Sequence, residues 1–244
     1  MKYSIILPAY NEEKIIEGTI MKVLDFMREF DKDFELIIAN DGSIDSTTKI
    51  IGRISESMPE LRMVSNIKNL GRGAALSNAF GRAKGEILIY IDADLAIDLE
   101  LFPRLMAAIE TEGADIAIGS KHIKGSQVEY PLLRRIASKG YAFLATLLLG
   151  SSVWDFQCGF KAFRREAIKK ILPFVREKGW SWDTEVLVKA EWMGYKIKEL
   201  PAKVVNVFER ESKVHLLRDI RRMGGGLLAL WLEKRNFTSS LAQR

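Results

Sequence analysis

Residues 87–94 read Ile-Leu-Ile-Tyr-Ile-Asp-Ala-Asp, a short apolar run that ends in two carboxylates. A continuous apolar run of this length is typical of a strand that is buried on both faces of a parallel sheet. If the chain stays extended past the run, Asp92 and Asp94 point to the same side, because side chains alternate along a strand. Two hard carboxylate ligands with room for water suit Mg²⁺ or Mn²⁺, and such an ion can also bridge a diphosphate. An Asp-x-Asp pair is common by chance, so its position directly after a strand is what favours a metal site.

The apolar pattern of this run recurs through the first half of the chain. Short apolar runs alternate with helix-length segments whose apolar residues are spaced three and four apart. The predicted strands are 3–7, 34–39, 61–64, 86–91 and 115–118, and the predicted helices are 12–30, 45–58, 72–83 and 99–111. This alternation predicts an α/β fold with a mostly parallel central sheet that is flanked by helices.

The pattern changes after about residue 120. The predicted elements there are a loop at 121–130, a long apolar helix at 131–150, strands at 159–164 and 196–200, and a helix at 184–193. No linker separates the two parts, so we expect one compact domain over 1–210, with halves 1–120 and 121–210. Residues 211–244 are expected to add an amphipathic helical tail, with an apolar side formed by Leu217, Ile220, Leu227 and Trp231.

Composition narrows the class of protein. The 244 residues are 48% apolar, with a mean hydropathy of −0.02, which excludes a disordered chain and a polytopic membrane protein. The net charge of +5 and the isoelectric point of about 9.2 favour an anionic partner. Nucleic acid is disfavoured because aromatic residues do not alternate with basic ones on any predicted strand.

The predicted compartment is the cytoplasm. The one cysteine, Cys158, excludes an internal disulfide, and the chain begins at once with strand-like residues rather than a charged leader. Its longest apolar stretches are shorter than the roughly 18–20 residues that span a bilayer.

Polar residues follow three of the predicted strands. The first strand leads into Pro8-Ala9-Tyr10-Asn11-Glu12, the second into Asn40-Asp41-Gly42-Ser43, and the fourth into Asp92-Ala93-Asp94. Each cluster alone can be an ordinary turn or helix cap. Ligands of parallel sheets bind beyond the carboxyl ends of the strands, so three such clusters together predict one binding cleft.

A glycine-rich segment, Asn69-Leu70-Gly71-Arg72-Gly73-Ala74-Ala75, opens the third predicted helix. Glycines there let backbone N–H groups approach an anion, and Arg72 adds positive charge. The alternative is an ordinary glycine-rich helix start. A zinc site is not predicted, because the only histidines are His122 and His215.

Taken together, the motifs of this chain resemble those of family 2 glycosyltransferases. They are 8–12, 40–43, 69–75, 92–94, Gly119-Ser120-Lys121 and Glu211-Ser212-Lys213. The chain looks most like the polyprenyl-phosphate branch, which contains the dolichyl-phosphate glucosyltransferases and the dolichol-phosphate mannose synthases. The segments Asp155-Phe156-Gln157-Cys158-Gly159-Phe160-Lys161 and Trp182-Asp183-Thr184-Glu185 lean towards the glucosyl enzymes. The resemblance implies the Rossmann-like GT-A fold, an inverting reaction and a divalent metal ion.

The resemblance also implies roles for individual residues. Tyr10 would lie beside the nucleotide base, and Asp41 would accept a hydrogen bond from its ring N–H, which does not distinguish UDP from GDP donors. The implied nucleotide-sugar site consists of Pro8, Tyr10, Glu12, Asp41, Arg72, Asp92, Arg210 and Lys213. The implied site for the phosphate of a polyprenyl or dolichyl acceptor consists of Lys121, Arg134 and Ser138. In this scheme residues 1–120 bind the nucleotide-sugar and 121–210 bind the acceptor.

The acceptor decides whether a general base is needed. The metal ion, Arg210 and Lys213 would neutralise the departing diphosphate. A lipid phosphate is already mostly dianionic at neutral pH and needs only positioning. A sugar hydroxyl would need a base, for which Asp183 and Glu185 are the candidates, although the pattern of that pair favours a solvated helix start. A third alternative is a catalytically silent module that binds nucleotide-sugars.

The tail leaves two interpretations open. Basic residues beside 227–232 could place the chain peripherally on the cytoplasmic face of an anionic membrane. Alternatively, the apolar side of the tail packs on the domain or in a dimer interface.

Overall fold

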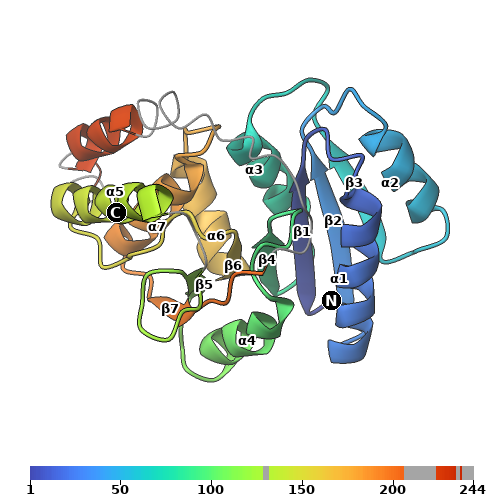
Figure 1. The fold of residues 1–244 in the computed structure, drawn as a ribbon, viewed down its shortest axis with the longest axis horizontal. Coiled ribbons are helices and arrows are strands. Elements are labelled where there is room, and N and C mark those ends of the chain that lie inside the picture. Colours follow the sequence, from blue (N-terminus) through green and yellow to red (C-terminus); the bar gives the residue numbers. More distant parts are fainter. Residues whose placement is uncertain (129–131, 206–223, 235–236, 238–244) are drawn as a thin grey trace.

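The computed structural model describes residues 1–128, 132–205, 224–234 and 237, and for 132–137 it describes the backbone alone (Figure 1). The predicted residues Arg210 and Lys213 therefore lie outside the described residues, as does the side chain of Arg134.

Seven strands of the described chain form a single mixed sheet, in the order β3-β2-β1-β4-β6-β5-β7. They are β1 (Tyr3–Ala9), β2 (Phe34–Asn40), β3 (Leu61–Ser65), β4 (Ile87–Ile91), β5 (Ile116–Ser120), β6 (Phe160–Arg164) and β7 (Ile197–Pro201). The first four strands are parallel, β6 runs antiparallel to both β4 and β5, and β5 is parallel to β7. All seven predicted strands are confirmed, with ends that differ by one or two residues.

Helices cover both faces of this sheet, as the apolar runs predict. They are α1 (Ile16–Phe30), α2 (Thr47–Ser55), α3 (Arg72–Arg82), α4 (Phe102–Glu110), α5 (Leu132–Leu149), α6 (Arg165–Ile171) and α7 (Trp182–Trp192), with short 3₁₀ turns at Leu99–Leu101 and Leu172–Phe174. Alternate residues of β1 enter different cores: Ile5 and Leu7 pack with α1, α2 and α4, whereas Ile6 packs with α3, α6 and α7. The alternation shows directly that the sheet is buried on both faces.

Helix α7 lies within the second of these cores. Every residue from Trp182 to Ala190 is buried, including the charged residues Asp183, Glu185 and Lys189. Buried charges are costly unless they are paired. The partners of these charges therefore determine how α7 is held, and those of Asp183 form the site described below.

The described part of the tail is a helix over 224–234 that packs on the domain. Leu227 and Leu230 enter the core shared with α5 and α7, and Glu233 accepts a hydrogen bond from Lys189 at 3.1 Å. Figure 1 shows this helix, in red, beside α5. Packing on the domain is thus observed for Leu227, whereas Trp231 on the same helix stays exposed. Among the described residues, we find no helix with the length and apolar content that crossing a membrane requires.

Candidate active site

The order of the strands places the candidate site. Going outward from β1, the chain adds β2 and β3 on one side and β4 on the other, so the strand order reverses between β1 and β4. Ligands of open α/β sheets bind at such a point, beyond the carboxyl ends of the strands. Because β2, β1 and β4 are adjacent and parallel, the three predicted polar clusters do meet at one edge.

The loops after β1 and β2 are tied to each other. The backbone N–H of Asp41 donates to the carbonyl of Ala9 at 2.9 Å, and the N–H of Asn11 donates to the Ser43 hydroxyl at 3.0 Å. The N–H of Glu12 donates to the Thr47 hydroxyl at 2.8 Å. The chain that carries Pro8, Tyr10 and Glu12 is thus held against the loop that carries Asp41, and the ring of Tyr10 is partly exposed.

Asp41 organises the glycine-rich segment ahead of α3. One carboxylate oxygen accepts hydrogen bonds from the Asn66 amide at 2.8 Å and the Leu70 N–H at 2.9 Å, and the other accepts from the Gly71 N–H at 2.8 Å. Gly71 has a φ of 106°, and a Cβ there would collide with the carbonyl oxygen of Lys178. Asp41 therefore holds the backbone that leads into Arg72. This is in addition to the role in base recognition that the resemblance implies.

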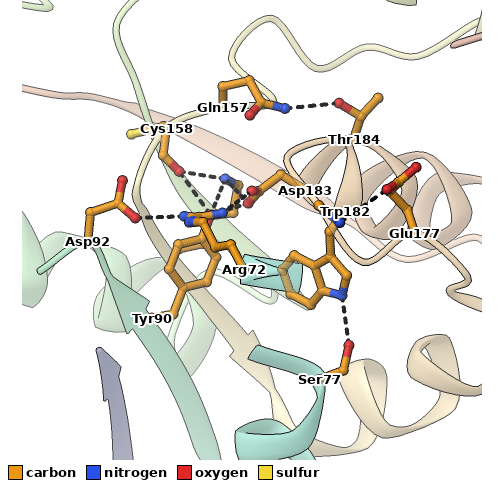
Figure 2. Close-up of polar contacts among 12 residues, drawn as sticks. Arg72, Ser77, Tyr90, Asp92, Gln157, Cys158, Glu177, Trp182, Asp183 and Thr184 are labelled. Carbon is orange, nitrogen blue, oxygen red and sulfur yellow. Dashed lines mark hydrogen bonds and ion pairs between the residues drawn. The ribbon is translucent and has the colours of Figure 1, made fainter. Parts of the chain in front are cut away.

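A charge cluster, buried except at Asp92, joins α3, β4, β6 and α7 (Figure 2). The Arg72 guanidinium donates to Asp183 Oδ2 at 2.5 Å and to Asp92 Oδ1 at 2.6 Å. Lys161 Nζ donates to Asp183 Oδ1 at 2.8 Å and to the Tyr90 hydroxyl at 2.7 Å, and that hydroxyl donates to Asp183. Two cations and two carboxylates thus balance in this cluster, which gives each of the four charges an opposite partner.

The ionisation of the cluster follows from these contacts. Burial alone raises the pKa of Asp183, but Lys161 and Arg72 outweigh burial and hold this pKa below its usual value. Burial, together with the negative charge of Asp183, raises the pKa of the Tyr90 phenol well above its usual value. At neutral pH Asp183 is therefore a carboxylate and Tyr90 a neutral donor.

The interpretation of Asp183 and Glu185 as a solvated helix start is wrong. Their side chains are 1% and 5% exposed, and each is paired with a lysine that is itself buried. Glu185 accepts from Lys189 Nζ and from the backbone N–H groups of Arg176 and Glu177, at 2.6, 3.0 and 2.7 Å. It therefore anchors the loop before α7. Neither carboxylate is free of cations, which makes both poor general bases, and the base role itself stays a prediction.

Asp92 is held from three sides. Its N–H donates to the carbonyl of Gly159 at 2.9 Å, Arg72 holds Oδ1, and Oδ2 lies where a Cβ on residue 159 would be. Beyond Asp92 the chain is not extended, because the Leu95 N–H donates to the Asp92 carbonyl at 2.9 Å and Leu95 has a φ of 49°. The expectation of simple strand alternation from Asp92 to Asp94 is therefore wrong: a turn places Asp94.

The two carboxylates nevertheless fit a divalent ion. Asp92 is 34% exposed, and Asp94 accepts a hydrogen bond from the Ala96 N–H at 3.1 Å. Within the described residues, no His, Cys, Asp or Glu joins them to form a three-ligand group. Mg²⁺ and Mn²⁺ are commonly held by one or two carboxylates together with substrate phosphates and water, which is the donor set available here.

The predicted acceptor residues lie at the end of β5. Lys121 Nζ forms an ion pair with the buried Asp155 at 2.9 Å, and its N–H donates to the same carboxylate at 2.7 Å. The neighbouring His122 is hydrogen-bonded to the Ser138 hydroxyl of α5 at 2.9 Å. The structure thus places Ser138 against the residue that follows Lys121, and Arg134 lies one helical turn before Ser138.

Sequence analysis missed Lys161 and Tyr90 as members of the charge cluster. The available signal was a single lysine in the run Phe160-Lys161-Ala162-Phe163, whose other side chains are apolar. A charge inside a buried strand must have a partner. Its partner, Asp183, could not be identified from that run alone.

Comparisons with known proteins agree with this architecture. The family model "Glycosyl transferase family 2" matches residues 4–172. The glycosyltransferase AglD of Haloferax volcanii is 36% identical over 233 residues, which cover 95% of this chain and 37% of that protein. The dolichyl-phosphate beta-glucosyltransferase ALG5A of Trichomonas vaginalis is 33% identical over 207 residues, 81% of this chain and 64% of that protein.

Among solved structures, glucosyl-3-phosphoglycerate synthase from Mycobacterium tuberculosis, in complex with Mn²⁺, UDP and phosphoglyceric acid, matches with a TM-score of 0.70. It is 23% identical, and the match covers 94% of this chain and 78% of that chain. The chain belongs to glycosyl transferase family 2 and has the predicted GT-A fold. It spans between about a third and two thirds of the length of the two curated relatives.

Proposed function

We propose that this chain is an inverting, metal-dependent transferase that moves one hexose, glucose or mannose, from a UDP- or GDP-sugar to the phosphate of a polyprenyl lipid of the dolichyl type. One observation carries the choice of acceptor. The two carboxylates that could serve as a base, Asp183 and Glu185, are both buried against cations. A phosphate acceptor needs no base, because its second pKa of about 6 leaves it mostly dianionic at neutral pH.

On the donor side, the base would lie beside Tyr10 and Asp41. Asp41 already accepts hydrogen bonds from three N–H groups, and a ring N–H of the base would add to them, since a carboxylate has about four acceptor positions. Asp92 and Asp94 would hold the divalent ion, which neutralises charge on the departing diphosphate. Arg72, Arg210 and Lys213 are the proposed cationic partners of that diphosphate.

On the acceptor side, Lys121, Arg134 and Ser138 would hold the lipid phosphate. Lys121 is 11% exposed and forms an ion pair with Asp155, whose own backbone N–H donates to Glu199 at 3.0 Å. A lysine bound in this way presents its charge at a defined place, which suits positioning of a dianionic nucleophile. The relatives named for dolichyl phosphate support this choice of acceptor.

A donor and acceptor screen tests the proposal. The full chain is incubated with radiolabelled UDP-glucose, GDP-mannose or UDP-galactose, Mg²⁺, and either polyprenyl phosphate or the matching polyprenol. We expect organic-extractable label from one hexose donor with the phosphate and none with the alcohol, because the two candidate bases, Asp183 and Glu185, are both paired with cations. Equal labelling of the polyprenol would overturn the phosphate acceptor, and no labelling with any donor would overturn the activity.

We also propose peripheral attachment to the cytoplasmic face of a membrane through α5 and the helix at 224–234. Both elements leave large apolar side chains exposed: Phe143, Leu144, Leu147, Leu228, Trp231 and Leu232. The sequence just before the second helix adds Arg218, Arg221 and Arg222. Apolar residues beside basic ones are the combination that binds anionic bilayer surfaces.

Vesicle flotation checks this attachment. We expect the chain to float with vesicles that contain about a third anionic lipid, less so at high salt, and the double variant Trp231→Glu, Leu232→Glu to float several-fold less. The matched control is Ile44→Glu, Ile67→Glu, which changes two equally apolar and well exposed residues after β2 and β3. An equal loss of flotation in both double variants, or no flotation of the parent chain, would contradict the proposed membrane attachment.

A further inference from the structure

Arg72 binds two carboxylates at once, and one of them belongs to the proposed metal site. Its guanidinium reaches Asp183 at 2.5 Å with one terminal nitrogen and Asp92 at 2.6 Å with the other. A guanidinium keeps its charge at any pH at which the protein is folded. Arg72 and a divalent cation are therefore attracted to the same carboxylate of Asp92.

Arg72 has contacts other than Asp92 that hold it in position. The guanidinium carbon lies 5.1 Å from the centre of the Tyr90 ring and 5.4 Å from that of Trp180, within the range of cation–π contacts. Asp183 is in turn fixed by Lys161 at 2.8 Å. Loss of the contact with Asp92 would leave Arg72 with a buried partner and two aromatic neighbours.

The two carboxylates differ in their access to solvent. Asp183 is 1% exposed and already accepts from Lys161 and Tyr90, whereas Asp92 is 34% exposed. An ion that arrives from solvent can reach Asp92 without disturbing the interior. The contact between Arg72 and Asp92 is therefore the one that can be exchanged.

We propose that Arg72 is the counterion of Asp92 while the donor site is empty. When a divalent cation binds together with a nucleoside diphosphate, the ion pair between Arg72 and Asp92 breaks, and Arg72 stays paired with Asp183. This inference rests on the proposed function. The free protein then binds the cation weakly, because the cation must displace a positive charge from its ligand. A diphosphate offers Arg72 a second anion, so nucleotide binding strengthens cation binding, and linkage makes the effect reciprocal.

The charges of the cluster predict opposite effects for two variants. Arg72→Met removes the competing cation, so Mn²⁺ should bind the nucleotide-free protein about 5–10-fold more tightly than it binds the parent chain. Asp183→Asn removes the second partner of Arg72 and leaves Asp92 as its main anion, so Mn²⁺ should bind more weakly. General damage to the site would weaken binding in both variants. The opposite signs therefore separate competition from misfolding.

The experiment measures Mn²⁺ binding to the full chain by electron paramagnetic resonance of the free ion, without nucleotide and with UDP or GDP. Arg82→Met is the matched control, because Arg82 ends the same helix and its guanidinium donates to the Asn78 side chain, at 2.7 Å, instead of to a carboxylate of the cluster. We expect this control to bind Mn²⁺ as the parent does. We expect the nucleotide to raise Mn²⁺ affinity less in Arg72→Met than in the parent.

Each result supports or overturns the inference. Tighter binding in Arg72→Met with weaker binding in Asp183→Asn supports it. Unchanged or weaker binding in Arg72→Met overturns it and leaves the proposed function standing. If the parent binds no Mn²⁺ even with either nucleotide, both the inference and the metal dependence fail. Should Arg72→Met not fold, as judged by circular dichroism, Arg72→Gln gives the same test, because it removes the charge but keeps a donor for Asp183.

Discussion

Asp92→Asn should lower kcat for hexose transfer about 10²–10³-fold, the largest loss that we expect from any near-isosteric substitution in this chain. The amide keeps the size of the side chain but removes one of the two negative ligands proposed for the divalent ion. It also replaces a charge-assisted acceptor of Arg72 with a neutral one. Because an ion held by Asp92 and Asp94 would stabilise charge that develops on the diphosphate, the loss should fall on kcat more than on KM for the donor.

Asp98→Asn is the matched control for this prediction. Asp98 follows on the same stretch of chain, where it accepts from the Glu100 N–H at 3.1 Å and pairs with Lys203 at 2.9 Å. It should change kcat by less than about twofold, because exposed ion pairs contribute little. Initial rates with saturating donor and lipid phosphate give both values. If Asp92→Asn kept more than about a third of the parent rate, Asp92 would not be a metal ligand.

The strands and the edge that holds the site could be predicted from sequence because both depend on local pattern. The run at 87–91 is apolar for its whole length, and the runs in β1, β2 and β5 are mostly apolar, a pattern that a sheet covered on both faces accommodates. Once the first strands are parallel, their carboxyl ends must meet at one edge, so Tyr10, Asp41 and Asp92 come together by topology. Helix α6 was missed because its seven residues, Arg165–Ile171, are too few to show a helical period.

The charge cluster could not be predicted, because its partners are distant in sequence. Arg72 and Asp183 are separated by 111 positions, and Lys161 and Asp183 lie on different elements. A carboxylate at a helix start has the same local pattern whether it faces solvent or a buried cation. Asp183 faces a buried cation and not solvent because α7 is enclosed by the rest of the domain. That enclosure depends on how the helices pack and cannot be read from residues 182–192 alone.

Lys161→Met should destabilise the folded chain by about 3 kcal/mol. Lys161 is fully buried on β6, and its three N–H groups are taken by Asp183, the Tyr90 hydroxyl and the Cys158 carbonyl. Removing one partner of a buried ion pair costs about 3–5 kcal/mol, because the remaining charge loses its compensation. The lower end of that range applies here, since Arg72 still neutralises Asp183 at 2.5 Å.

Urea unfolding followed by circular dichroism measures this loss, as a lower midpoint with an unchanged dependence of the unfolding free energy on urea. Lys198→Met is the matched control, because Lys198 lies in β7 of the same sheet and pairs with Glu112 at the surface, where its side chain is 42% exposed. Solvent screens that pair, so the control should cost no more than about 1 kcal/mol. If both variants lost equally little unfolding free energy, Asp183 would not depend on Lys161, and Arg72 alone would hold the cluster.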